Sequence, residues 1–183
     1  MASSRKNLSD YSKSNIKFQN KESKFTIGIV VSEWNRDITD KLADAAINTL
    51  KKYGYSEEDI IKKYVPGSFE LVLGAKYLIN YAVVDAVICL GCVIQGETRH
   101  FDFICSAVSE GIMKLNIDME IPVSFGVLTT DNIQQAIDRA GGKHGNKGDE
   151  AAIAVLKMLH LENSLWEEFG TEFMEDEDYF EDI

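Results

Sequence analysis

Residues 85–101 read DAVICLGCVIQGETRHF, and this stretch decides the fold. The run up to Ile94 is apolar on both faces, which is typical of a central strand in a parallel sheet. The run breaks at Gly96 into a polar turn that brings Thr98, Arg99 and His100 to the start of a helical pattern. In α/β proteins such strand-to-helix turns bind anions and carry proton-transfer groups. We therefore expect an α/β fold with a functional site at this turn.

Strand and helix patterns alternate on both sides of this stretch. Short β-rich apolar runs predict strands, and apolar residues spaced by three or four predict helices between them. Ser68 is the expected cap of the second helix, and Thr130 or Asp131 that of the fourth. Strict alternation predicts a four-stranded parallel sheet with helices on both faces. The expected strands cover residues 25–31, 59–65, 85–94 and 122–128, and the last helix runs from Ala151 to Leu165 after a glycine-rich break, GGKHGNKG.

Charge divides the chain of 183 residues into three parts, within a net charge of −11. Residues 1–24 are basic and predict a flexible arm, residues 25–166 form one α/β domain, and residues 167–183 are an acidic, flexible tail. An acidic body argues against nucleic-acid binding, which needs a basic face. No apolar run approaches the length of a membrane span, and no signal peptide is visible, so we expect a cytoplasmic protein.

Cys89 and Cys92 match the C-x-x-C spacing of redox and metal sites. Both fall inside a predicted strand, however, where positions three apart point to opposite faces. A metal site would also need further ligands. We therefore expect these cysteines to be structural and to bind no metal.

The polar side chains gather at the predicted strand ends, SEWN, VPGSFE, VIQGETRH and FGVLTT. In a parallel sheet these ends meet at one edge, where ligands bind. Trp34 can pack at the sheet edge or stack on a flat heterocycle, with Asn35 binding a polar substituent. Ser68 and Glu70 can cap a helix or, with Phe69, recognise a ring. His100 is the only histidine in these turns and suits proton transfer.

Three cations, Arg139, Lys143 and Lys147, surround the glycine-rich break. They can complement a helix dipole, or a guanidinium can bind phosphate with two hydrogen bonds. To bind phosphate within one chain, Arg139 would have to reach its own GET turn. Otherwise a neighbouring subunit completes the site.

Five segments in register resemble the lumazine synthase (6,7-dimethyl-8-ribityllumazine synthase) family. They are SEWNRDIT, VPGSFEL, GCVIQGETRHFDFI, FGVLTTDNIQQAIDRAG and GNKG, within roughly residues 25–160. The resemblance implies a three-layer flavodoxin-like fold that assembles into pentamers, sometimes twelve of them in an icosahedral 60-subunit shell. It also implies condensation of 5-amino-6-(D-ribitylamino)uracil with 3,4-dihydroxy-2-butanone 4-phosphate, the penultimate step of riboflavin synthesis, with no metal and no organic cofactor.

The resemblance also implies a role for each matching residue. His100 would transfer protons, Trp34 would stack on the pyrimidine, and Asn35 would hold the ribityl chain. The remaining residues of the ribitylaminouracil pocket would be Ser68, Phe69, Glu70, Cys92, Val93 and Ile94, closed by Phe125. Glu97 and Thr98 would bind the phosphate of the four-carbon substrate, and Arg139 would reach it from the adjacent subunit.

Three positions depart from the family pattern: Trp34 replaces a more usual Phe, Val72 a Pro, and Gln95 an Arg. The indole favours flavin binding, so a non-catalytic flavin-binding shell protein is an alternative. A flavodoxin-like electron carrier is a weaker alternative, because the turn after the first strand lacks the phosphate-binding loop expected there. The short GGKHGNKG connection favours the 60-subunit shell over the pentamer, and a riboflavin synthase is a candidate partner inside it.

Overall fold

The computed structural model describes residues 25–177, with side chains described as far as Gly170. The predicted basic arm, residues 1–24, and the end of the predicted acidic tail, residues 178–183, lie outside the described residues.

Four parallel strands form the main sheet, in the order β2-β1-β3-β4. Ile27 of β1 lies between Ile60 of β2 and Ala86 of β3 in the register. The predicted four-stranded parallel sheet is therefore confirmed. This order places the topological switch point between β1 and β3, where open α/β sheets bind ligands beyond the strand ends. The strands are β1 (Ile27–Ser32), β2 (Ile60–Val65), β3 (Ala86–Ile94) and β4 (Val123–Thr130).

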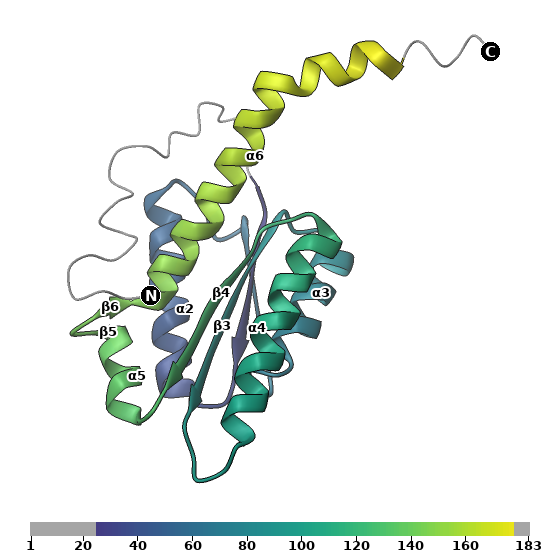
Figure 1. Ribbon diagram of the computed structural model, residues 1–183. Helices are drawn as coiled ribbons and strands as arrows, with labels where there is room; N and C mark the ends of the chain where they lie inside the picture. Colours follow the sequence, from purple (N-terminus) through teal and green to yellow (C-terminus); the bar gives the residue numbers. More distant parts are fainter. Residues whose placement is uncertain (1–24, 178–183) are drawn as a thin grey trace.

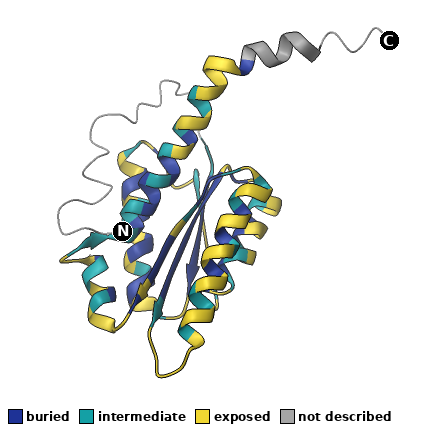
Figure 2. Ribbon diagram, viewed as in Figure 1, coloured by how far each residue is buried: buried dark blue, intermediate teal, exposed yellow. Residues whose placement is uncertain are grey.

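Helices cover both faces of the sheet, so the fold has three layers (Figure 1). Ile29 and Val30 are adjacent in β1 and both fully buried, yet they belong to two separate apolar clusters. The cluster of Ile29 includes Leu42 of α2 and Leu156 of α6, and that of Val30 includes side chains of α3 and α4. Figure 2 shows the strands buried between these layers. The helices are α2 (Arg36–Lys52), α3 (Leu71–Ala82), α4 (His100–Met119), α5 (Ile133–Arg139) and α6 (Lys147–Glu177).

The predicted capping role of Ser68 is wrong. Glu70 is the residue that precedes α3, and it makes no side-chain capping hydrogen bond. The Ser68 hydroxyl is buried and has no hydrogen-bond partner within the part of the chain that the structure describes. It is turned toward the sheet instead, because a Cβ added to Gly91 of β3 would lie 2.6 Å from this hydroxyl.

The predicted cap of α5 is also wrong by one residue. Asn132 caps the helix, since its side-chain oxygen accepts a hydrogen bond from the Gln135 N–H at 3.0 Å. Thr130 is still part of β4, and Asp131 accepts a hydrogen bond from the Gln135 side-chain amide at 3.1 Å. β4 therefore runs two residues further than its apolar pattern indicates, and the helix starts correspondingly later.

The glycine-rich break is a small antiparallel ribbon of β5 (Ala140–Gly142) and β6 (Gly145–Asn146). Its turn uses the positive φ angles of Gly141 (103°) and Gly145 (77°), which glycine adopts without steric cost. Asn146 then joins two helices: its oxygen accepts from the Gly148 N–H at 2.8 Å, and its amide donates to the Lys41 carbonyl at 3.1 Å. The ribbon thus fixes the start of α6 against α2.

Helix α6 continues past the predicted domain boundary at Trp166 as far as Glu177. The first part of the predicted acidic tail, from residue 167 to Glu177, is therefore helical. Gly170 is buried beneath the Trp166 indole, so the helix carries internal packing beyond the body of the domain. Within residues 25–177, no helix has a segment that is both long and apolar enough to cross a membrane.

Cys89 and Cys92 lie on opposite faces of the sheet, as the strand pattern predicts. Cys89 belongs to the cluster under α3 and α4, and Cys92 to the one under α2 and α6. Burial raises the pKa of each thiol to about 12, and the nearby Asp37 carboxylate adds to the effect at Cys92. Cys105 is less buried, and its pKa is raised by burial and by Asp102.

We expect Cys105 to react first with a maleimide at neutral pH, and Cys89 and Cys92 to react only after unfolding. Their folded pKa exceeds the unfolded value, so the protonated thiols favour the native state at neutral pH. This contribution is lost as pH rises from about 9 to about 12. Mass spectrometry of the maleimide-treated protein, native and urea-unfolded, measures which cysteines have reacted. Cys105→Ser is the control. Labelling of Cys89 as fast as Cys105 would contradict the burial argument.

Candidate active site

A cavity of about 830 Å³ opens at the carboxyl ends of β1 and β3, at the switch point of the sheet. It is formed by the turns after β1 and β2, the end of β3 and the first turns of α4. Segments far apart in the sequence therefore meet here, as the strand ends predict. The lining residues are Trp34, Asn35, Gly67, Ser68, Phe69, Glu70, Cys92, Val93, Ile94, His100 and Ile104.

Two aromatic side chains at this cavity are unusually exposed. Trp34 is 72% exposed and Phe69 is 58% exposed, although both are large and apolar. Aromatic side chains left open in a cavity offer π faces on which a flat ring can stack. A planar heterocycle is therefore a suitable ligand for this part of the cavity.

Asn35 fixes the geometry between the two strand ends. Its backbone is left-handed (φ 57°, ψ 45°), a conformation that Asn tolerates better than most residues. Its side-chain amide donates a hydrogen bond of 2.9 Å to the Cys92 carbonyl, which ties the turn after β1 to β3. The Asn35 side-chain oxygen makes no hydrogen bond among the described residues, so it can accept one from a hydroxyl or N–H of a ligand.

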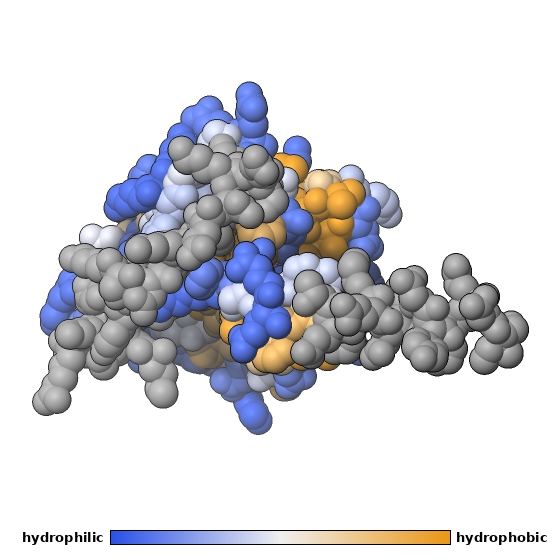
Figure 3. Space-filling view, turned by 90° about the horizontal axis from the view of Figure 1, so that it is seen from above, coloured by the Kyte–Doolittle hydropathy of each residue, from blue (hydrophilic) through white to orange (hydrophobic). Residues whose placement is uncertain are grey.

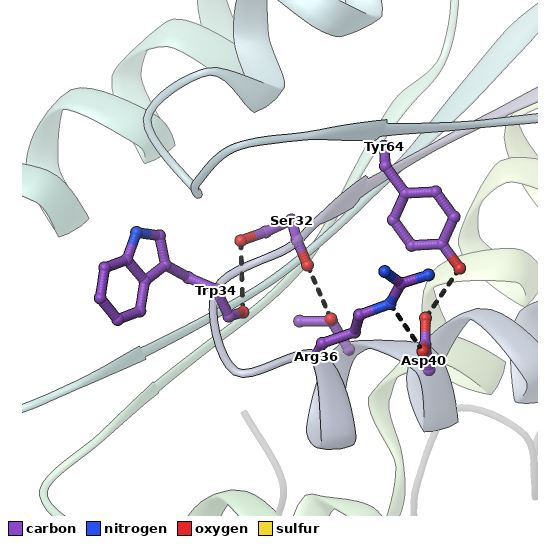
Figure 4. A network of polar contacts seen from close by, with 6 residues as sticks. Ser32, Trp34, Arg36, Asp40 and Tyr64 are labelled. Carbon is purple, nitrogen blue, oxygen red and sulfur yellow. Dashed lines mark hydrogen bonds and ion pairs between the residues drawn. The ribbon is translucent and has the colours of Figure 1, made fainter.

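A network of polar contacts holds the turn that presents Trp34 (Figure 4). The buried Thr39 hydroxyl donates to the Ser32 carbonyl at 2.7 Å, which anchors α2 to the end of β1. Asp40 accepts hydrogen bonds from Arg36 at 3.2 Å and from the Tyr64 hydroxyl at 2.8 Å. The Arg36 guanidinium also lies 4.6 Å from the centre of the Tyr64 ring. The Trp34 indole therefore projects from a turn that hydrogen bonds hold in place.

His100 is the first residue of α4 and lines the cavity, where its side chain is exposed. Its backbone N–H donates to the Thr98 hydroxyl at 3.4 Å. Within residues 25–177, the N–H groups of Gly96, Glu97 and Thr98 have no hydrogen-bond partner. Free N–H groups beside a helix N-terminus favour a bound anion, so the turn can hold one next to an imidazole.

The sequence was compared with known proteins. The profile of the family described as 6,7-dimethyl-8-ribityllumazine synthase matches residues 24–163. A protein of that name from Cytophaga hutchinsonii is 60% identical over 159 residues, covering 87% of this chain and 98% of the relative. The chain belongs to this family. Relatives of the same name from Parabacteroides distasonis and Flavobacterium johnsoniae are 52% and 53% identical, each over 88% of this chain and over 99% and 83% of their own length.

Four residues to which the lumazine synthase resemblance gives a role do not line the cavity of their own chain. Glu97 and Thr98 are exposed in the turn before α4. Phe125 is 43% exposed on the edge strand β4, opposite Cys89 in the register. Arg139 ends α5, and its guanidinium donates to the Gln135 carbonyl at 3.0 Å. Among the described residues that line the cavity, there is therefore no Lys or Arg for a phosphate.

The other two cations near the ribbon differ from each other. Lys147 is paired with Glu150 at 2.5 Å, and both side chains are mostly buried. Lys143 is exposed. Lys147 therefore stabilises the first turn of α6, whereas Lys143 can meet an external partner.

Sequence reasoning missed two residues that line the cavity, Gly67 and Ile104. Gly67 belonged to a Pro-Gly pair that indicated only the end of a strand. Ile104 belonged to the apolar stripe of α4, which indicated only a core position. Only their position in the sequence could have identified them, since each lies within four residues of a predicted site residue.

Proposed function

We propose that this chain condenses 5-amino-6-(D-ribitylamino)uracil with 3,4-dihydroxy-2-butanone 4-phosphate to give 6,7-dimethyl-8-ribityllumazine, with release of phosphate and water. The observation that carries this proposal is one cavity that combines two exposed aromatic faces, an amide anchored between β1 and β3, and an imidazole at a helix N-terminus. Membership of the lumazine synthase family supports the same reaction.

The pyrimidine ring stacks on Trp34, with Phe69 on the other wall of the cavity. The Asn35 side-chain oxygen accepts from the ribityl chain, while its amide keeps the bond to the Cys92 carbonyl. The Glu70 carboxylate accepts from ring N–H groups, and Ser68, Cys92, Val93 and Ile94 complete the wall. The substrate is thus held flat, with its amine directed toward the mouth of the cavity.

The phosphate of the second substrate binds the turn of Glu97 and Thr98, whose N–H groups are free. Its cationic partner is Arg139 of an adjacent subunit, and Phe125 of that subunit closes the cavity. This arrangement requires a homo-oligomer. Exposed apolar side chains on α3 and α4 support a homo-oligomer, because a monomeric protein rarely exposes so many large apolar side chains to water. They are Leu73, Tyr77, Tyr81, Phe103, Met113 and Ile117.

The amine attacks the ketone of the butanone, and the resulting carbinolamine loses water. Elimination of phosphate then leaves an enol, which tautomerises to a ketone. The amine that carries the ribityl chain attacks this ketone, and loss of a second water closes the ring. His100 takes and returns protons in these steps, since it faces both the cavity and the phosphate turn. Because amine and ketone react readily once held together, positioning supplies much of the rate acceleration.

Mixing the two substrates with the protein and following lumazine absorbance tests the proposal. We expect product with the wild-type chain and a rate lower by about one to two orders of magnitude with His100→Ala. A wild-type chain that binds lumazine and makes none would instead support the flavin-binding shell protein. A fully active His100→Ala variant would remove the proton-transfer role.

The assembly is a pentamer or a shell of twelve pentamers, located in the cytoplasm. The short ribbon between α5 and α6 supports the shell, which can enclose a riboflavin synthase. Light scattering of the purified protein separates the two sizes.

Replacing Trp34 by alanine is expected to weaken riboflavin binding about tenfold or more, because the open indole is the main stacking surface. Quenching of the flavin's own fluorescence on titration with protein measures the affinity without using the tryptophan as reporter. Trp166→Ala is the matched control, since this second tryptophan lies on α6, outside the cavity. Equal affinities of the two variants would contradict the stacking role.

A further inference from the structure

The far end of the molecule carries an apolar groove that the proposed reaction does not use. It has a volume of about 530 Å³ and lies between the end of α4, the start of β4 and the second half of α6. This is the amino edge of the sheet, opposite the candidate active site. Figure 3 looks onto this end and shows hydrophobic side chains at the surface. The groove is lined by Asn116, Ile117, Glu120, Ile121, Pro122, Met158, Leu161, Glu162 and Leu165.

Helix α6 carries an apolar stripe that begins in this groove and continues beyond it. Its members are large, exposed and spaced by three or four residues, so they share one side of the helix. Trp166 lies beside them, with 61% of its surface exposed. Apolar residues in this spacing on the open side of a helix are typical of a contact with another helix. The stripe consists of Met158, Leu161, Leu165 and Phe169.

The outer part of this stripe lies outside the matched family domain. The family match ends at residue 163, whereas α6 runs to Glu177. Figure 1 shows this extension projecting beyond the sheet and the other helices. The domain from which it projects leaves Leu165, Trp166 and Phe169 exposed. A second molecule that covers these side chains would remove a large apolar area from water.

Two opposite charges lie beside the stripe. Lys157 and Glu168 are about three helical turns apart and therefore lie on the same flank of α6. Within residues 25–177, neither side chain takes part in an ion pair. The inner half of this flank is thus basic, and the outer half is acidic.

This distribution of charge fits a second copy of the same helix in the antiparallel direction. Two α6 helices can lie antiparallel with Leu161 of each copy level with Leu165 of the other. Lys157 of each copy then lies beside Glu168 of the other, and the opposite charges attract. A parallel pair would instead bring like charges together. The partner that this surface fits is therefore a second copy of this chain.

We propose that the α6 helices of two copies of this chain pair antiparallel, so that the extension of each lies on the groove of the other. Trp166 and Phe169 of one copy then cover Met158 of the other and the groove beside it. Both copies use the same surface, as two-fold symmetry requires. Glu162 lies near the two-fold axis, where solvent screens the repulsion between the two exposed carboxylates. The contact leaves the candidate active site open and does not depend on the proposed reaction.

A single cysteine near the two-fold axis should link two copies through a disulfide. Glu162→Cys places a cysteine there, and Glu167→Cys is the matched control, because it removes the same charge on the side of α6 that faces away from the stripe. Both are made in a Cys105→Ser background, since Cys89 and Cys92 are buried. Mild oxidation and a non-reducing gel should show roughly tenfold more covalent dimer with Glu162→Cys. Equal yields from the two variants, or no dimer from Glu162→Cys, would overturn the proposal.

Exchanging the flanking charges tests the antiparallel direction. In the Glu162→Cys background, Lys157→Glu brings two carboxylates together between the copies, and Glu168→Lys brings two ammonium groups together. Each change should slow disulfide formation roughly threefold or more at low salt. The combined variant Lys157→Glu, Glu168→Lys restores opposite charges across the contact, so its rate should return to within about twofold of the starting protein. A combined variant as slow as the single variants would overturn the antiparallel pair.

Discussion

Gly148→Ala is expected to destabilise the protein by about 3 kcal/mol or more, or to prevent folding. A Cβ at this position would lie 1.9 Å from the Leu42 carbonyl oxygen, a backbone atom in the middle of α2. To admit the methyl group, α6 would have to move away from α2 and break the Asn146 contacts that join the two helices. Urea unfolding followed by circular dichroism measures the loss.

Gly96→Ala is the matched control for this prediction. Gly96 has open space where a Cβ would lie, and its φ is not positive. The same substitution there should change the free energy of unfolding by less than about 0.5 kcal/mol. Equal stability of Gly148→Ala and the wild-type chain would show that α6 does not approach α2 as closely as described.

Arg139→Ala is expected to raise the KM for 3,4-dihydroxy-2-butanone 4-phosphate by roughly 10- to 100-fold. A charge-assisted guanidinium–phosphate contact contributes about 1.5–3 kcal/mol. The KM for the ribitylaminouracil should change little, because Arg139 lies outside the cavity that holds it. Steady-state kinetics with each substrate varied in turn separates the two effects.

Lys143→Ala serves as the control for Arg139→Ala, since Lys143 is an exposed cation in the ribbon that follows α5. Its removal should alter the phosphate-dependent KM less than threefold, as expected for a screened surface charge. If both variants behaved alike, a general electrostatic effect would replace the specific contact.

The arrangement of the sheet could be predicted from the sequence because its signals are local and repeated. The strand at residues 86–94 is apolar on both faces, and only a central parallel strand needs this. The meeting of Trp34, Phe69 and His100 followed from the same pattern, since carboxyl ends of parallel strands share one edge.

The features that the sequence did not predict depend on contacts between residues far apart in the chain. Ser68 does not cap α3 because its hydroxyl is turned toward Gly91, a residue in another strand. The acidic composition after Trp166 gave no signal for a helix, yet α6 continues to Glu177, and Leu161, Leu165 and Phe169 keep a spacing of four along it. Phe125 and Arg139 lie outside the cavity of their own chain. For Arg139, the resemblance to the family already implied a contact with the phosphate from the adjacent subunit.

The central claim is that one chain supplies the cavity and another supplies Arg139. Co-expression of Arg139→Ala with the double variant Trp34→Ala, His100→Ala tests it directly, through lumazine formation by the mixed oligomer at a concentration of the phosphorylated substrate well below the KM of Arg139→Ala. If the site lies between subunits, random mixing pairs an intact cavity with an intact Arg139 at roughly a quarter of the sites, and activity rises far above that of either variant alone. If each chain builds its own site, the mixed oligomer shows only the average activity of the two variants, which would contradict the account.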